Sequence, residues 1–271
     1  MASGAAARNN VQVYGPEDGP VLVFAHGFGT DQGMWSKVLP WFTDRYRVVL
    51  LDHVGSGGSD QSAYDSATYS TLDAYVDDLM ELCGELDLQD VTLIGHSVGS
   101  MMAVSAAARD TGRRFGRLVL VTASPSYLDH PEDGYVGGFT RQDIDDVFES
   151  LDANYVVWAE SMAPVYMNTP HAPELEHEIQ GSFGRISPRV ARDFARVAFL
   201  SDVRHLLGEV TVPVLVLQST DDVVTPDHVG TYLHSALPNS TLVRLAATGH
   251  FPQSSAPAET SAAILEFLKP A

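Results

Sequence analysis

A serine between two glycines places the strongest single constraint on how this chain folds. Ser97 lies in the run 95–99 (GHSVG), which follows the apolar segment 91–94 and precedes the small-residue segment 98–107. A strand, a sharp turn and a helix in this order expose the serine at the turn, and the two glycines leave room for close backbone contacts. The run therefore predicts a nucleophilic serine at the carboxyl end of a buried strand.

The first half of the chain alternates short apolar runs with helical patterns. Continuous apolar runs at 47–51, 91–95 and 117–121 are typical of strands covered on both faces. The runs 11–14 and 21–25 flank a turn signal rich in glycine and proline, and we expect them to form a hairpin. The alternation predicts an α/β fold with a mostly parallel, twisted sheet flanked by helices.

The pattern changes after residue 124, where helical periodicity dominates and no convincing strand occurs. The helical stretches expected there are 144–151, 155–167, 173–183 and 188–200. Strands then resume at 214–217 and 241–245, with helices at 228–237 and 258–268. We therefore expect a core formed by residues 1–124 and 207–271, and a helical lid of residues 125–206 inserted between them.

Two residues later in the chain can complete a catalytic set around Ser97. A serine needs a base to take its proton, and that base needs an acid to hold its orientation. His250 and Asp222 each follow a predicted strand, and the order serine, acid, histidine is the one expected for this kind of fold. Asp221 is the competing acid. We prefer Asp222, which lies four residues before Pro226, and interpret Asp221 as a turn or helix-cap carboxylate.

The negative charge that develops on a substrate carbonyl needs preorganised donors. The backbone N–H of Val98, directly after the nucleophile, is one candidate for this oxyanion hole. The second is the N–H of Phe28, in the loop that follows the run 21–25. His26 in that loop is interpreted as structural, and His96 as a pocket residue or a hydrogen-bonded supporting residue.

Two other patterns suggest ligands but are interpreted as structural. The run 55–60 (GSGGSD) does not complete the glycine spacing of a dinucleotide-binding loop, and no helix opens directly on it. His171, Glu174, His177 and Glu178 have the chemistry of metal ligands, but their spacing fits the solvated face of a helix. We therefore expect neither a metal nor a cofactor.

The charge of the chain limits its partners. The formal net charge is −19, and such a field repels nucleic acid and anionic membranes. No apolar run reaches the roughly 20 residues that span a bilayer. The first eight residues look flexible and lack the basic start and apolar core of a secretory signal. We expect a cytoplasmic monomer without a nucleic-acid or membrane partner.

Several motifs together resemble one family. They are the runs 26–32, 52–57, 95–99, 124–128 and 137–139, with Asn154, Tyr155, Trp158, Phe199, Ser201 and Asp202. In these positions the chain resembles the RsbQ-like family of bacterial stress-signalling hydrolases and the related plant strigolactone and karrikin receptors, over nearly its whole length. Gly99 and the segment 54–60 look like the bacterial type.

The resemblance implies an α/β-hydrolase fold with a V-shaped, four-helix lid over a deep, mostly apolar pocket. Carried over position by position, the residues expected to line that pocket are Phe28, His96, Tyr127, Val147, Trp158, Met162, Phe199, Val223 and Val224.

Two functions follow from the residues and the resemblance. The first is a serine hydrolase, similar to a carboxylesterase or lactonase, that cleaves an ester or lactone of a small hydrophobic molecule through an acyl-enzyme. The second is a ligand sensor that hydrolyses slowly or only once and presents its lid to a signalling protein. A perhydrolase-like reaction on the same three residues has no distinctive support.

Overall fold

The computed structural model describes residues 4–112 and 114–269, and a seven-stranded sheet forms the centre of this described part. The strands are β1 (Gln12–Tyr14), β2 (Val21–Ala25), β3 (Arg47–Leu50), β4 (Val91–His96), β5 (Phe115–Val121), β6 (Val214–Thr220) and β7 (Ser240–Thr248). Their order in the sheet is β1-β3-β2-β4-β5-β6-β7. The β1–β3 pair is antiparallel and the other described pairs are parallel, which confirms the predicted α/β class.

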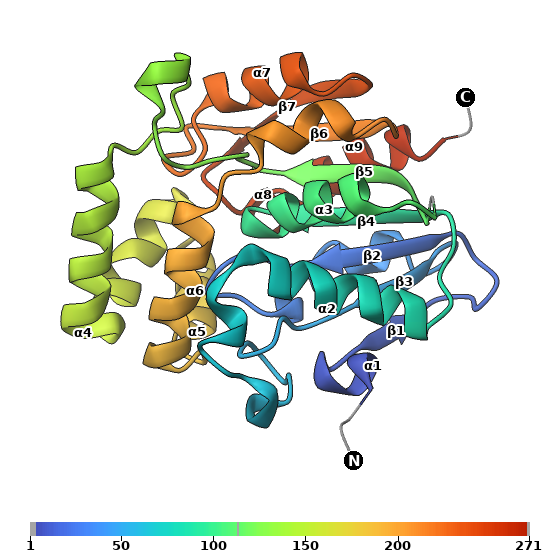
Figure 1. Ribbon diagram of the computed structural model, residues 1–271, viewed down its shortest axis with the longest axis horizontal. Coiled ribbons are helices and arrows are strands. Elements are labelled where there is room, and N and C mark those ends of the chain that lie inside the picture. The colour runs from blue at the N-terminus through green and yellow to red at the C-terminus, as the bar shows by residue number, and fades with distance from the viewer. Residues whose placement is uncertain (1–3, 113, 270–271) are drawn as a thin grey trace.

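Helices on both faces of the sheet explain the continuous apolar strands. The core helices are α1 (Ala5–Arg8), α2 (Leu72–Glu85), α3 (Val98–Arg109), α7 (Asp227–Ala236), α8 (Pro252–Ser255) and α9 (Pro257–Phe267). Figure 1 shows α2 and α3 in front of the sheet and α9 behind it. Every residue of β4 is therefore buried, and this central strand ends directly at Ser97.

The hairpin predicted between β1 and β2 is wrong. β2 pairs on both sides with parallel strands, β3 and β4, and β1 pairs instead with β3 at the edge of the sheet. The physical reason is burial: β2 is almost wholly buried and needs covered neighbours, whereas all three residues of β1 are exposed. A short, exposed strand is suited to an edge.

The start of the described chain is also more ordered than its composition suggests. Residues 5–8 form α1, and the Arg8 guanidinium pairs with Asp78 at 2.7 Å and with Glu81 at 2.6 Å on α2. The flexibility expected for the first eight residues is therefore not found over residues 5–8. Residues 1–3 lie outside the described part.

A helical insertion lies between β5 and β6, as predicted. Its helices are α4 (Arg141–Met167), α5 (Pro173–Phe183) and α6 (Pro188–Leu200). The backbone of α4 leaves helical geometry at Asn154 (φ −162°, ψ 97°), so the insertion contains four α-helical segments. Figure 1 shows the insertion at one end of the sheet. Within the described residues no helix is both long and apolar enough to cross a bilayer.

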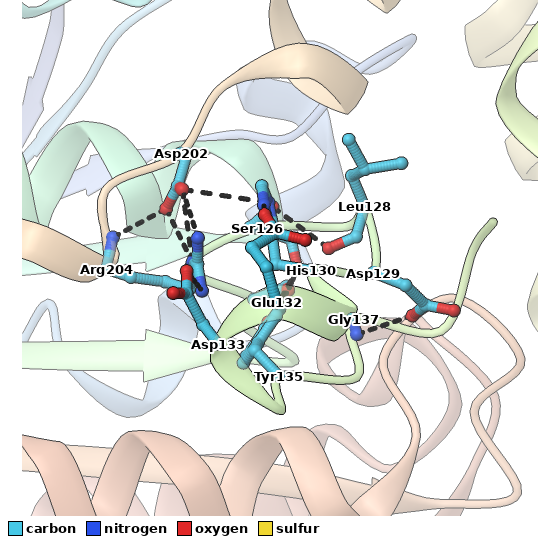
Figure 2. A network of polar contacts seen from close by, with 11 residues as sticks. Ser126, Leu128, Asp129, His130, Glu132, Asp133, Tyr135, Gly137, Asp202 and Arg204 are labelled. Atoms are coloured by element: carbon cyan, nitrogen blue, oxygen red, sulfur yellow. Dashed lines mark hydrogen bonds and ion pairs between the residues drawn. The ribbon is translucent and has the colours of Figure 1, made fainter. Parts of the chain in front are cut away.

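The two connections between the insertion and the core meet in the polar network of Figure 2. Ser126 forms an antiparallel bridge with Asp202, and the Val203 N–H donates to the Pro125 carbonyl at 2.8 Å. The Arg204 guanidinium lies 2.7 Å from Asp202 on its own connection and 3.2 Å from Asp133 on the other. It also lies 4.8 Å from the centre of the Tyr135 ring. One arginine therefore ties both connections together.

Replacing Arg204 by alanine is expected to lower the free energy of unfolding by about 1–2 kcal/mol, because charged hydrogen bonds across the two connections are lost. The side chain is only 13% exposed, so solvent screens these contacts incompletely. Urea titration would measure the change. Arg141→Ala is the control, because Arg141 makes an exposed pair with Asp145 within one helix. Equal effects of the two substitutions would contradict the importance assigned to Arg204.

Candidate active site

Ser97 lies in the tight turn between β4 and α3, with φ 56° and ψ −123°. Positive φ is rare for a residue with a side chain, and the surrounding packing holds it here. A Cβ on Gly95 would lie 2.3 Å from the Gly99 carbonyl oxygen, and one on Gly99 would lie 2.5 Å from that of Ala25. The two glycines are therefore needed for the backbone contacts that form the turn.

Ser97, His250 and Asp222 form one buried chain of hydrogen bonds. The Ser97 Oγ lies 2.9 Å from His250 Nε2, and His250 Nδ1 lies 2.8 Å from Asp222 Oδ2. The second carboxylate oxygen, Oδ1, accepts from the backbone N–H groups of Val224 and Thr225, and the Thr225 hydroxyl donates to Oδ2 at 2.6 Å. Each of the two carboxylate oxygens therefore has two hydrogen-bond partners, and these contacts fix the orientation of the Asp222 side chain.

The charge on Asp222 determines where the protons lie in the hydrogen bonds that join Asp222, His250 and Ser97. Burial by itself raises the pKa of Asp222, but the His250 imidazole and the hydrogen bonds from Thr225 and Val224 outweigh it and hold the pKa below its ordinary value. The carboxylate is therefore ionised and can only accept. His250 Nδ1 must then carry the proton of its hydrogen bond to Asp222, which leaves Nε2 as the nitrogen that can accept the Ser97 proton.

His250 Nδ1 pairs with Asp222 and not with Asp221, the competing acid. Asp221 has a left-handed backbone (φ 50°) and an exposed side chain, while its carbonyl accepts from the Asn168 side-chain amide at 3.2 Å. The structure thus brings Asp222, and not Asp221, to the histidine.

The end of α4 in the insertion contacts the loops that carry the acid and the histidine. The His250 N–H donates to the Tyr166 carbonyl at 2.7 Å, and the Thr248 hydroxyl donates to the Asn168 carbonyl at 2.9 Å. The Asn168 amide reaches Asp221, as described above. The end of α4 is therefore linked by hydrogen bonds to the loops that carry Asp222 and His250.

The two candidate oxyanion donors come from the turns after β2 and β4. Val98 is the first residue of α3, so its N–H has no acceptor within the helix. Phe28 follows β2, and its ring contributes to the wall around Ser97. His26 supports this loop: its Nε2 accepts from the His53 N–H at 2.9 Å, which leaves Nδ1 as donor to the Gly27 carbonyl.

A narrow, mostly apolar cavity adjoins Ser97. Its lining residues are Phe28, His96, Ser97, Tyr127, Tyr166, Phe183, Ala198, Phe199, Val224, His250 and Phe251. The space open to the centre of a water molecule is about 30 Å³, enough for one or two waters. Pockets that hold small molecules are commonly larger than this. A ligand larger than two water molecules would have to displace lining side chains, and Phe183 and Phe199 are the two aromatic ones among them that belong to α5 and α6.

Five of the residues expected to line the pocket line this cavity: Phe28, His96, Tyr127, Phe199 and Val224. The other four do not. Val147, Trp158 and Met162 line a separate, open groove on the insertion, and Val223 is 51% exposed.

Packing explains why these four residues lie elsewhere. The Trp158 ring lies behind the cavity wall, with its centre 6.0 Å from that of Phe28 and 5.8 Å from that of Phe183. Val223 is 51% exposed whereas its neighbour Val224 is 5% exposed, so only Val224 of the two is buried. Sequence reasoning missed Tyr166, Phe183, Ala198 and Phe251 as lining residues. Of these four, only Phe251 could have been found from the sequence, because it directly follows His250.

His96 is both a lining residue and a hydrogen-bonded support, the two alternatives that its position suggests. Its Nε2 lies 2.8 Å from the His250 carbonyl, which also accepts from the Thr122 hydroxyl at 3.1 Å. Burial lowers the pKa of His96 well below its ordinary value, so the ring is neutral. The neutral His96 ring therefore supports the backbone of the loop that carries His250 and adds no charge to the cavity wall.

The remaining candidate ligand patterns have structural partners. In the glycine-rich run 55–60, the Gly58 N–H donates to the Asp52 carboxylate at 2.8 Å, which makes a tight turn. His177 contacts the Pro173 carbonyl in its own helix, and Glu178 pairs with Lys37. Among the described residues, the group that could hold a metal is His130, Glu132 and Asp133 in the network of Figure 2, where Arg204 already pairs with Asp133.

The chain is similar to known hydrolases in both sequence and fold. Residues 20–257 match a family described as the alpha/beta hydrolase fold. Strigolactone esterase D14 from Arabidopsis thaliana is 39% identical over 92% of this chain and 92% of its own length. Karrikin insensitive 2 receptor IA from Petunia hybrida is 34% identical over 91% of this chain and 89% of its own. The structure of a hydrolase from Oleispira antarctica matches with a TM-score of 0.92 and 36% identity over 98% of each chain.

Proposed function

Because the chain belongs to the α/β-hydrolase family, in the group of the strigolactone and karrikin receptor esterases, we propose that it cleaves an ester or lactone of a small hydrophobic molecule. The observation that carries the proposal is the buried chain from Ser97 through His250 to Asp222 beside an apolar cavity. Such an arrangement supplies a nucleophile, a base and an orienting acid in one place.

The reaction proceeds in two halves. The Ser97 Oγ attacks the carbonyl carbon while His250 Nε2 takes its proton, and Asp222 stabilises the resulting imidazolium. The N–H groups of Val98 and Phe28 hold the oxyanion. His250 then protonates the leaving alcohol oxygen, which leaves an acyl group on Ser97. A water molecule then attacks the acyl group while it gives a proton to His250, and His250 returns that proton to the Ser97 Oγ as the acid is released.

The apolar lining selects the substrate class. Aromatic and aliphatic side chains form most of the wall, with few polar groups besides the catalytic ones, and no charged partner for an ionic substrate lines the cavity among the described residues. Uncharged, compact acyl groups or lactones therefore suit the site best. Short acyl esters and butenolide-type esters are the appropriate test substrates.

The second candidate is a ligand sensor that turns over slowly. The contacts of Tyr166 and Asn168 with the catalytic loops favour it, because a ligand that displaces the insertion also disturbs those loops. The partner would then be a signalling protein that contacts the insertion. The cytoplasmic location and the monomeric state stay predictions from the sequence.

Labelling with a fluorophosphonate, which reacts with activated serines, tests the proposal. Intact mass and peptide mapping should place one label on Ser97, and short esters should be hydrolysed. Many rapid turnovers favour a metabolic enzyme, whereas very slow turnover with a ligand-dependent shift in Tm favours a sensor. Absence of both labelling and hydrolysis in the folded protein would contradict a serine hydrolase of either kind.

A further inference from the structure

A second side chain touches the nucleophile. The phenol oxygen of Tyr127 lies 2.9 Å from the Ser97 Oγ, at the wall of the cavity. Tyr127 is only 2% exposed, so this contact is shielded from bulk water. The triad mechanism makes no use of it.

The proton positions in the triad decide the direction of this hydrogen bond. His250 Nε2 accepts from Ser97, because Nδ1 carries the proton that faces the ionised Asp222. Serine has a single hydroxyl proton, and that proton is directed to His250. Tyr127 must therefore donate to a lone pair of the Ser97 Oγ. Burial raises the pKa of Tyr127, so the phenol keeps its proton.

The backbone around Tyr127 is held firmly by the network at the base of the insertion. The Phe139 N–H donates to the Tyr127 carbonyl at 3.1 Å. Figure 2 shows the neighbouring Ser126 beside Tyr135, whose phenol donates to the Ser126 carbonyl at 2.6 Å. A Cβ on Gly137 would lie 2.5 Å from the Tyr127 carbonyl, so the two backbone segments are in close contact. The backbone that carries the phenol is therefore fixed by contacts with residues 135–139.

We propose that Tyr127 is a catalytic residue of the second half of the reaction, in which it stabilises the Ser97 Oγ as the leaving atom. The inference rests on the proposed hydrolase function. When the tetrahedral intermediate formed by water collapses, the bond between the acyl carbon and Oγ breaks and its electron pair goes to Oγ. His250 returns a proton to Oγ, while Tyr127 donates a hydrogen bond and keeps its own proton.

A donor on Oγ affects the two halves of the reaction in opposite ways. It draws electron density from Oγ, which makes Ser97 a weaker nucleophile during acylation and a better leaving group during deacylation. Loss of the phenol should therefore leave acylation as fast or faster and slow deacylation. The acyl-enzyme would then accumulate.

Tyr127→Phe tests this with 4-nitrophenyl acetate, whose alcohol leaves readily. Stopped-flow measurement should show a burst of close to one nitrophenolate per active site, with a burst rate no lower than in the wild type. The steady-state rate should fall by about 10-fold or more. Intact mass should show the acetylated protein, with the acetyl group on Ser97. Tyr14→Phe, which removes an exposed phenol on β1, should match the wild type.

Two results would overturn the assignment of Tyr127: an unchanged steady-state rate, or an equal fall in the burst and steady-state rates. Both leave the hydrolase function intact, since Ser97 still reacts. If neither wild type nor variant forms an acetyl-enzyme or hydrolyses the ester, the proposed function itself fails.

Two controls accompany this experiment. The Tm of Tyr127→Phe shows whether the variant is folded. Tyr135→Phe, which keeps the Tyr127 phenol but loosens its support, should slow deacylation in the same direction by a smaller factor, and an unchanged rate would count against the proposal.

Discussion

Replacing Ser97 by alanine is expected to lower kcat for ester hydrolysis by about 10⁴- to 10⁶-fold. The substitution removes the atom that forms the acyl-enzyme, and His250 and Asp222 then have no nucleophile to activate. The burst of product and the fluorophosphonate label should both disappear. Alanine and serine experience similar strain at the positive φ of this turn, so Tm should change little.

Ser105→Ala is the matched control for Ser97→Ala. Ser105 is a buried serine on α3 that does not line the cavity, and the variant should hydrolyse esters at close to the wild-type rate. Ligand-induced shifts in Tm should persist in Ser97→Ala, because the apolar wall is intact. If Ser97→Ala kept more than a tenth of the wild-type kcat, Ser97 would not be the nucleophile.

Replacing Asp222 by asparagine is expected to lower kcat by about 10⁴-fold without a large change in KM. An asparagine amide donates where the carboxylate accepts, so His250 is held in the wrong tautomer to take the Ser97 proton. The pKa of Asp222 lies below its ordinary value of about 3.9, so the carboxylate is ionised at neutral pH. The loss should therefore be measured at neutral pH, where the wild-type carboxylate is ionised.

Asp221→Asn is the control for the acid, because asparagine tolerates the left-handed backbone at that position. Its activity should stay near that of the wild type, and the opposite ranking of the two variants would make Asp221 the acid.

The Asp222 carboxyl also affects the stability of the fold. Ionised Asp222 stabilises the fold above the ordinary carboxyl pKa, and this contribution is lost as the pH falls through the lower pKa of the folded state. Thermal unfolding of the wild type and Asp222→Asn between about pH 2 and 5 would measure it.

Features set by local chemistry were predictable from the sequence. The strands β2 to β6 are short apolar runs between helical patterns, and their alternation by itself indicates a parallel sheet. The turn at Ser97 requires its flanking glycines for steric reasons, so it is visible as a short motif. Asp222 and His250 follow strands whose carboxyl ends meet at one edge of the sheet, and parallel pairing brings them to Ser97.

Features that depend on packing between distant segments were decided only by the tertiary structure. Because β2 pairs with β3 on one side and β4 on the other, β1 lies at the edge of the sheet and does not form the expected hairpin with β2. The way in which the helices of the insertion pack on the core puts Phe183 in the cavity wall and Trp158 behind that wall. The hydrogen bond from Tyr127 to Ser97 joins residues 30 apart in sequence through the network at the base of the insertion. No pattern encodes such a contact, because it depends on where two separately folded segments come to rest against each other.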